Sequence, residues 1–241
     1  PSEPFRVALE DWSIASTASY ASEFAPLRLR ARDDAFAVDL ALEAGKPPVL
    51  QGERGLSQKG PEPGNASYYY SMTRLPARGT VTVAGEKIAV TGEAWLDREW
   101  STSALGPDLA GWDWFALQLE DGRELMFYRL RRKDGAADPW SRGSLVAADG
   151  SSRSLGAADV QLTPLSTWQS PTGASYPAKW RLIVPNEGLD LELSPRVANQ
   201  ELAVTVRYWE GAVQVKGTSR GKPIHGHGFV ELTGYAPPRD P

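Results

Sequence analysis

The chain has 241 residues, 41% of them hydrophobic, with nine Trp, eight Tyr and no Cys. Without cysteine there is no disulfide, no thiolate nucleophile and no Cys-ligated zinc, and no apolar run of about 18 residues offers a membrane-spanning helix. The formal net charge of −4 gives no general attraction to nucleic acid or to an anionic membrane surface.

Alternation of apolar and polar residues starts in residues 27–32 and continues along the chain. The same pattern returns in 36–40, 81–83, 202–206 and 213–215. A period of two is typical of half-buried antiparallel strands, and turns containing Asp, Gly and Pro separate the runs. No long stretch has helical periodicity, so the chain is predicted to be nearly all β.

The densest candidate for chemistry is the segment Trp95–Trp100. On a strand, Trp95, Asp97 and Glu99 face one way while Arg98 faces the other. If the first face lines a cavity, desolvation raises the pKa of the two carboxyl groups and leaves one of them protonated as a general acid. The alternative is a strand end whose charges pair with each other at the surface.

Aromatic residues gather before and after that segment. The long connection 45–70 is rich in Gly, Pro and Lys and ends in Tyr68-Tyr69-Tyr70, and Trp112 and Trp114 follow the segment. Long connections are often functional, and aromatic walls bind flat or extended apolar ligands. Large aromatic residues equally dominate cores, so a purely structural role is the competing interpretation.

Two charged clusters lie further along the chain. Residues 129–133 carry three Arg and one Lys, which a solvated hairpin end explains better than nucleic-acid binding in this acidic chain. His225 and His227 share a strand face with Glu231 and could chelate a metal. Two histidines are a weak metal signal, and a solvated pair explains them as well. We therefore expect no metal and no other cofactor.

The second half of the chain repeats the first in the same order. The matching segments are 29–42 with 180–193, 79–85 with 211–217, and 92–97 with 226–231. Two related domains are therefore predicted, residues 1–105 being the C-terminal part of the first and 106–241 the second. The second copy has two strand pairs before Trp168, which aligns with Trp12. Because a barrel avoids open edges, we expect the missing opening of the first copy, roughly 50 residues, in a longer chain or in a partner chain.

Three segments in order resemble the AttH-type, lipocalin-like family, which includes hydroxyneurosporene synthase, a carotenoid hydratase. These segments are 59–71, 95–100 and 111–119. The resemblance implies two tandem lipocalin-like (calycin) antiparallel β-barrels, the first lacking its N-terminal strands, with a ligand cavity at or near their junction. It also implies a periplasmic or secreted location, although the sequence Pro1-Ser2-Glu3-Pro4 has none of the features of a signal peptide.

The resemblance also assigns candidate site residues. Those expected to bind ligand are Trp95, Trp100, Trp112, Asp113, Trp114, Tyr69 and Tyr128, and those expected to catalyse are Asp97, Glu99 and Arg98. The junction motif of the hydratases carries histidines where this chain has Leu96 and Arg98. Asp97 is left as the proton donor to an alkene, with water adding to a carbocation that Trp95 or Trp112 stabilises.

Two functions follow. The first is binding of a lipid- or isoprenoid-like molecule, because no unambiguous catalytic set is visible. The alternative is a hydratase, isomerase or cyclase that acts on an unsaturated apolar substrate by acid catalysis. A third interpretation is a structural partner, associated with an N-terminal fragment or a membrane transport system. We expect no nucleic-acid partner and no transmembrane segment.

Overall fold

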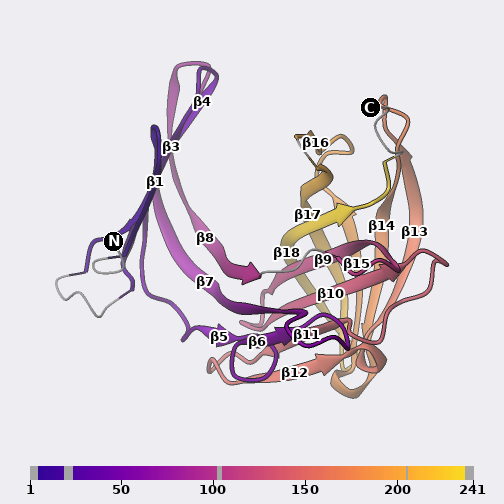
Figure 1. Ribbon diagram of the computed structural model, residues 1–241. Coiled ribbons are helices and arrows are strands. Elements are labelled where there is room, and N and C mark those ends of the chain that lie inside the picture. The colour runs from indigo at the N-terminus through magenta and orange to yellow at the C-terminus, as the bar shows by residue number, and fades with distance from the viewer. Residues whose placement is uncertain (1–4, 19–23, 102–104, 205, 237–241) are drawn as a thin grey trace. The chain divides into compact units, whose positions relative to one another are not determined.

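A computed structural model describes residues 5–18, 24–101, 105–204 and 206–236 of the chain (Figure 1). It consists of two curled antiparallel half-barrel sheets, with two short 3-10 turns, η1 (Ala157–Asp159) and η2 (Pro185–Glu187). The all-β prediction is confirmed. Residues Pro1–Pro4, on which the signal-peptide question rests, lie outside the described residues. Among the helices of the described residues, none is long and apolar enough to cross a membrane.

The first sheet has eight strands. They are β1 (Arg6–Leu9), β2 (Trp12–Ser16), β3 (Leu27–Arg32), β4 (Phe36–Leu42), β5 (Val49–Leu50), β6 (Leu56–Gln58), β7 (Ala66–Val83) and β8 (Glu86–Ser101). Their order is β1-β2-β3-β4-β7-β5, with β6 and β8 also paired to β7. The buried core of this sheet is small, consisting of Leu27, Leu42, Met72 and Leu75.

The second sheet has ten strands and follows the order β12-β11-β10-β9-β18-β17-β15-β14-β13, with β16 paired to β17. Its strands are β9 (Leu109–Leu119), β10 (Glu124–Arg132), β11 (Arg142–Val146), β12 (Ser152–Gly156), β13 (Gln161–Gln169), β14 (Ser175–Val184), β15 (Leu189–Pro195), β16 (Glu201–Ala203), β17 (Arg207–Ser219) and β18 (Lys222–Thr233). A large apolar core packs on one face of this sheet.

The chain divides into two compact units. The first comprises residues 1–48 and 71–97, and the second comprises 49–70 and 98–241. The long connection 45–70 holds β5, β6 and the start of β7, and most of it belongs to the second unit. The predicted domain boundary between residues 105 and 106 stays a prediction.

The strand register assigns side chains of the second sheet to its two faces. Phe115 of β9 is opposite Phe127 of β10 and Val230 of β18, and all three are buried in the apolar core. Successive side chains of a strand point to opposite faces. Trp114 and its partner Tyr128 therefore lie on the other face. We call these the core face and the outer face.

Candidate functional site

One row of side chains crosses the outer face of the second sheet. Glu210 of β17, Glu231 of β18, Trp114 of β9, Tyr128 of β10 and Arg142 of β11 are successive cross-strand partners. Directly opposed residues of neighbouring antiparallel strands have adjacent side chains on the same face. The row therefore holds two acids at one end, two aromatic rings in the middle and an arginine at the other end.

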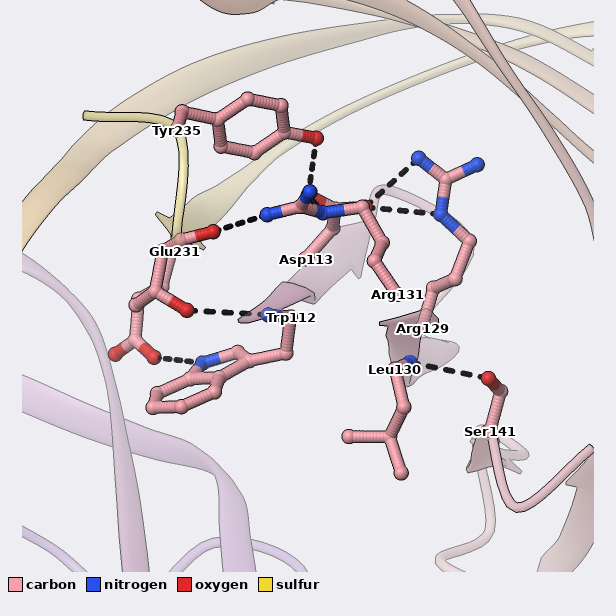
Figure 2. Close-up of polar contacts among 9 residues, drawn as sticks. Trp112, Asp113, Arg129, Leu130, Arg131, Ser141, Glu231 and Tyr235 are labelled. Carbon is pink, nitrogen blue, oxygen red and sulfur yellow. Dashed lines mark hydrogen bonds and ion pairs between the residues drawn. The ribbon is translucent and has the colours of Figure 1, made fainter. Parts of the chain in front are cut away.

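Glu231 is the group of this row whose pKa is clearly shifted. Burial raises the pKa of its carboxyl group to about 7, and the negative charges of Glu210 and Glu99 act in the same direction. The indole Nε1–H of Trp112 donates a hydrogen bond to Glu231 Oε1, which opposes the rise (Figure 2). A carboxyl group with such a pKa is partly protonated at neutral pH and is suited to general acid catalysis.

Aromatic side chains surround this carboxyl group. The ring of Trp112 meets that of Tyr208 edge to face, with 6.4 Å between centroids. Burial raises the pKa of Tyr208, and the charges of Glu231 and Glu210 add to the rise. Trp114, opposite Glu231 in the register, donates its indole N–H to the hydroxyl of the buried Tyr69 at 3.0 Å. The acid therefore lies in an aromatic environment.

A lysine covers the middle of the row. Lys59 Nζ lies 2.9 Å from Glu99 Oε1 and 3.7 Å from the centroid of the Tyr128 ring. The hydroxyl of Tyr128 and that of Ser57 are 2.9 Å apart, in hydrogen-bond contact in a buried position. Glu99 is thus engaged in an ion pair, and Tyr128 is fixed by the segment that carries Ser57 and Lys59. Lys59 is not among the site residues predicted from the sequence, although Lys59 begins one of the three segments on which the family resemblance rests.

Asp97 has different surroundings in the first unit. Its carboxylate accepts one hydrogen bond from Ser71 Oγ and another from the indole N–H of Trp95, the latter at 2.8 Å. Both donors are neutral side chains. Asp97 and Trp95 are thus brought together, as the alternation of the strand predicts.

Within the Trp95–Trp100 segment, only Glu99 and Trp100 are exposed. Trp100 is 51% exposed and lies near the rings of Tyr68 and Tyr70, with centroid distances of 5.9 and 6.3 Å. Arg98 is half-buried. The predicted roles of Arg98 in catalysis and of Trp100 in ligand binding stay predictions.

Asp113 lies on the core face, opposite to its neighbours Trp112 and Trp114. Its buried carboxylate pairs with Arg129 at 2.7 Å and Arg131 at 3.2 Å, and it accepts a hydrogen bond from Tyr235 at 2.7 Å (Figure 2). A buried carboxylate needs such partners. The interpretation of the basic cluster as a solvated hairpin end is therefore wrong for Arg129 and Arg131, because both are largely buried against Asp113.

The two histidines lie on β18 with their side chains exposed. His227 is the cross-strand partner of Gln118 and Gln214. Within the part of the chain that the structure describes, no three His, Cys, Asp or Glu side chains are close enough to hold a metal ion.

Two curled antiparallel half-barrel sheets are typical of lipocalin-like β-barrel proteins. The sequence model of the AttH-like family matches residues 1–235, and the chain belongs to this family.

Two relatives are similar over most of this chain. Kievitone hydratase of Fusarium solani subsp. phaseoli is 26% identical over 221 residues, which are 85% of this chain and 59% of the relative. The chain thus spans about three fifths of that relative's length. A crystal structure of a protein described as AttH, from Nitrosomonas europaea, has a TM-score of 0.85 and 38% identity, over 96% of this chain and 70% of that one.

The fold is shared with a hydratase of known structure. The crystal structure of kievitone hydratase from Nectria haematococca has a TM-score of 0.76 and 24% identity, over 94% of this chain and 69% of that one. The family resemblance inferred from residues 59–71, 95–100 and 111–119 is thereby confirmed. The homologues support a hydratase-like or ligand-binding β-barrel.

Proposed function

We propose that the protein binds an unsaturated apolar small molecule and adds water across one of its C=C bonds, with Glu231 as the proton donor. The observation that carries the proposal is the pKa of about 7 at Glu231, beside Trp112 on the aromatic outer face. The similarity to kievitone hydratase supports the same reaction class.

The reaction balances with a single acid. The π electrons of the alkene take the proton from the Glu231 carboxyl group, which leaves a carbocation at the neighbouring carbon and a carboxylate on the protein. Water forms the new C–O bond at the cation, and the resulting oxonium returns one proton to Glu231. The face of Trp112 or Trp114 stabilises the cation between the two steps.

This proposal gives Glu231 the role first expected of Asp97. The two residues occupy matching positions of the repeat, in 226–231 and 92–97. Asp97 accepts two hydrogen bonds from neutral donors, whereas Glu231 has acidic neighbours that favour its protonated form. Asp97 remains the second candidate for the acid.

Binding without turnover is the second candidate function. Trp112, Trp114 and Tyr208 offer apolar surface around a carboxyl group, and such surface holds an isoprenoid-like ligand whether or not a proton is transferred. The periplasmic or secreted location that the resemblance implies stays part of this proposal.

The two functions separate in one experiment. The purified protein is incubated with kievitone or with neurosporene, and the product is examined by mass spectrometry for the gain of one water. We expect Glu231→Gln to abolish hydration while retaining binding. We expect Glu210→Gln to retain most of the hydration activity. Binding without any hydrated product would support the second candidate, and full hydration by Glu231→Gln would remove Glu231 as the acid.

A further inference from the structure

A pocket of about 410 Å³ lies on the outer face of the second sheet, at the arginine end of the row. It is an open pocket of the second unit, lined by residues of the segment 51–57 and of β10, β11 and β12. Its lining includes Gln51, Ser57, Tyr128, Arg142, Ser154 and Gly156. The volume is that of a site for a small organic molecule.

Arg142 brings an unneutralised charge to this pocket. Within the described part of the chain its side chain makes neither an ion pair nor a hydrogen bond, and its Nε–H is buried without an acceptor. Its guanidinium lies 5.1 Å from the centroid of the Trp140 ring. The guanidinium group of arginine is always charged, and a buried N–H donor left without an acceptor is destabilising. This N–H is therefore available to an acceptor on a bound ligand.

The backbone around Arg142 provides the space for a ligand. Gly156 is the cross-strand partner of Arg142, so no side chain stands opposite the guanidinium on β12. A Cβ placed at Gly156 would have only Asp159 Oδ2 nearby, at 3.6 Å. Ser144, two residues along the same strand, has a buried hydroxyl oxygen that also lacks a hydrogen-bond partner. The open space and the unpaired guanidinium N–H thus occur together at the arginine end of the row.

The charge balance of the pocket favours an anion. Glu53, the one carboxylate of its lining, is 86% exposed and lies 4.0 Å from Arg54, which is 91% exposed. Such a solvated rim pair contributes little field inside the pocket. Arg142 is the one half-buried charge, and its flat fork of donors matches the two oxygens of an oxyanion.

We propose that this pocket, the Arg142 pocket, binds the oxyanion group of a small molecule, either a carboxylate or a phosphate monoester, through the guanidinium of Arg142. The inference is independent of hydration by Glu231, because it concerns the opposite end of the row and is tested by binding alone.

The test follows the Arg142 Nε–Hε signal in ¹H–¹⁵N spectra of the labelled protein, assigned by its loss in Arg142→Gln. Benzoate and phenyl phosphate serve as the two oxyanion probes, and benzamide as a neutral probe of similar shape. We expect a saturable shift with one or both oxyanions and none with benzamide. Charge-assisted hydrogen bonds predict a loss of affinity of ~10- to 100-fold in Arg142→Gln, measured in both proteins from the backbone amide signals of the pocket residues, which the variant retains.

The matched control is Arg153→Gln, which removes the same charge from β12. Arg153 is ion-paired with Glu187 at 2.8 Å and does not line the pocket. Unchanged affinity in this variant, with an unaltered melting midpoint in Arg142→Gln, supports the assignment, and the tighter probe identifies the class of oxyanion. The absence of a saturable shift with either oxyanion, or equal binding of benzamide, would overturn the inference.

Discussion

The two faces of the second sheet differ in whether their charged side chains have partners of opposite charge. On the core face, Asp113 is surrounded by Arg129, Arg131 and the hydroxyl of Tyr235, so its charge is fully compensated. On the outer face, Glu231 has acidic neighbours and Arg142 makes no ion pair within the described residues. Compensated charge is a means of holding a fold together. Uncompensated charge on a partly buried face is a common mark of a functional site.

The largest expected effect comes from removing a charged group from the core face. Asp113→Ala leaves two largely buried arginines without their common partner, and we expect a loss of about 3–5 kcal/mol in the free energy of unfolding. Urea denaturation measures it. The control Asp121→Ala breaks the more exposed pair with Arg123 and should cost no more than about 1 kcal/mol. Equal losses in the two variants would contradict the contrast between the faces.

The second effect is a pH dependence on the outer face. The pKa of Glu231 rises from its ordinary 4.5 to about 7 on folding, so the folded protein binds the proton more tightly than the unfolded chain does. Stability therefore falls as pH rises from about 4.5 to 7, by up to about 3 kcal/mol. Glu231→Gln should remove this loss. The free energy of unfolding of both proteins is measured at pH 5 and at pH 8. The same change between the two pH values in both proteins would refute the prediction.

A smaller effect concerns the indole that holds Glu231. Trp112→Phe removes the donor to the carboxylate, so the pKa of Glu231 should rise further, by roughly one unit. The side-chain carboxyl signal of Glu231 in ¹³C NMR gives the titration. Trp114→Phe is the matched control, because the indole of Trp114 donates to Tyr69. A lowered pKa in Trp112→Phe would contradict the assigned direction.

The smallest effect is expected at Arg142. Since this side chain has no ion pair within the described residues, Arg142→Gln should change the free energy of unfolding by less than about 0.5 kcal/mol. Arg129→Gln, on the core face, should be clearly destabilising, because it removes a partner of the buried Asp113. Thermal denaturation of the two variants measures this difference. Equal losses of stability in the two variants would contradict the prediction.

The sequence predicts the all-β fold because apolar and polar residues alternate along most of the chain. The same alternation separates Trp112 and Trp114 from Asp113, although all three were assigned together to ligand binding. In the sequence, Glu231 stands out only as the repeat partner of Asp97 and as the acid that shares a strand face with His225 and His227. Its proximity to Glu210 depends on the pairing of β17 with β18, which local patterns do not fix.

The Arg142 pocket is beyond sequence reasoning for a related reason. It requires residues 51–57 to fold onto strands that come some 70 residues later, as the contact between Ser57 and Tyr128 illustrates with a separation of 71 residues. No periodicity in residues 45–70 indicates such a long-range partner. Only the tyrosine run, residues 68–70, distinguishes that segment from an ordinary connection.

The membership of residues 49–70 in the second unit means that the two repeats are not interchangeable modules. A gene cut at the predicted boundary would yield a C-terminal half without Ser57, Lys59 and Tyr69, and the rings of Tyr128 and Trp114 would lose these polar partners. During synthesis, residues 49–70 are made first and wait for strands that are translated later. Recombination between family members should therefore preserve this segment together with the second repeat, and not with the first.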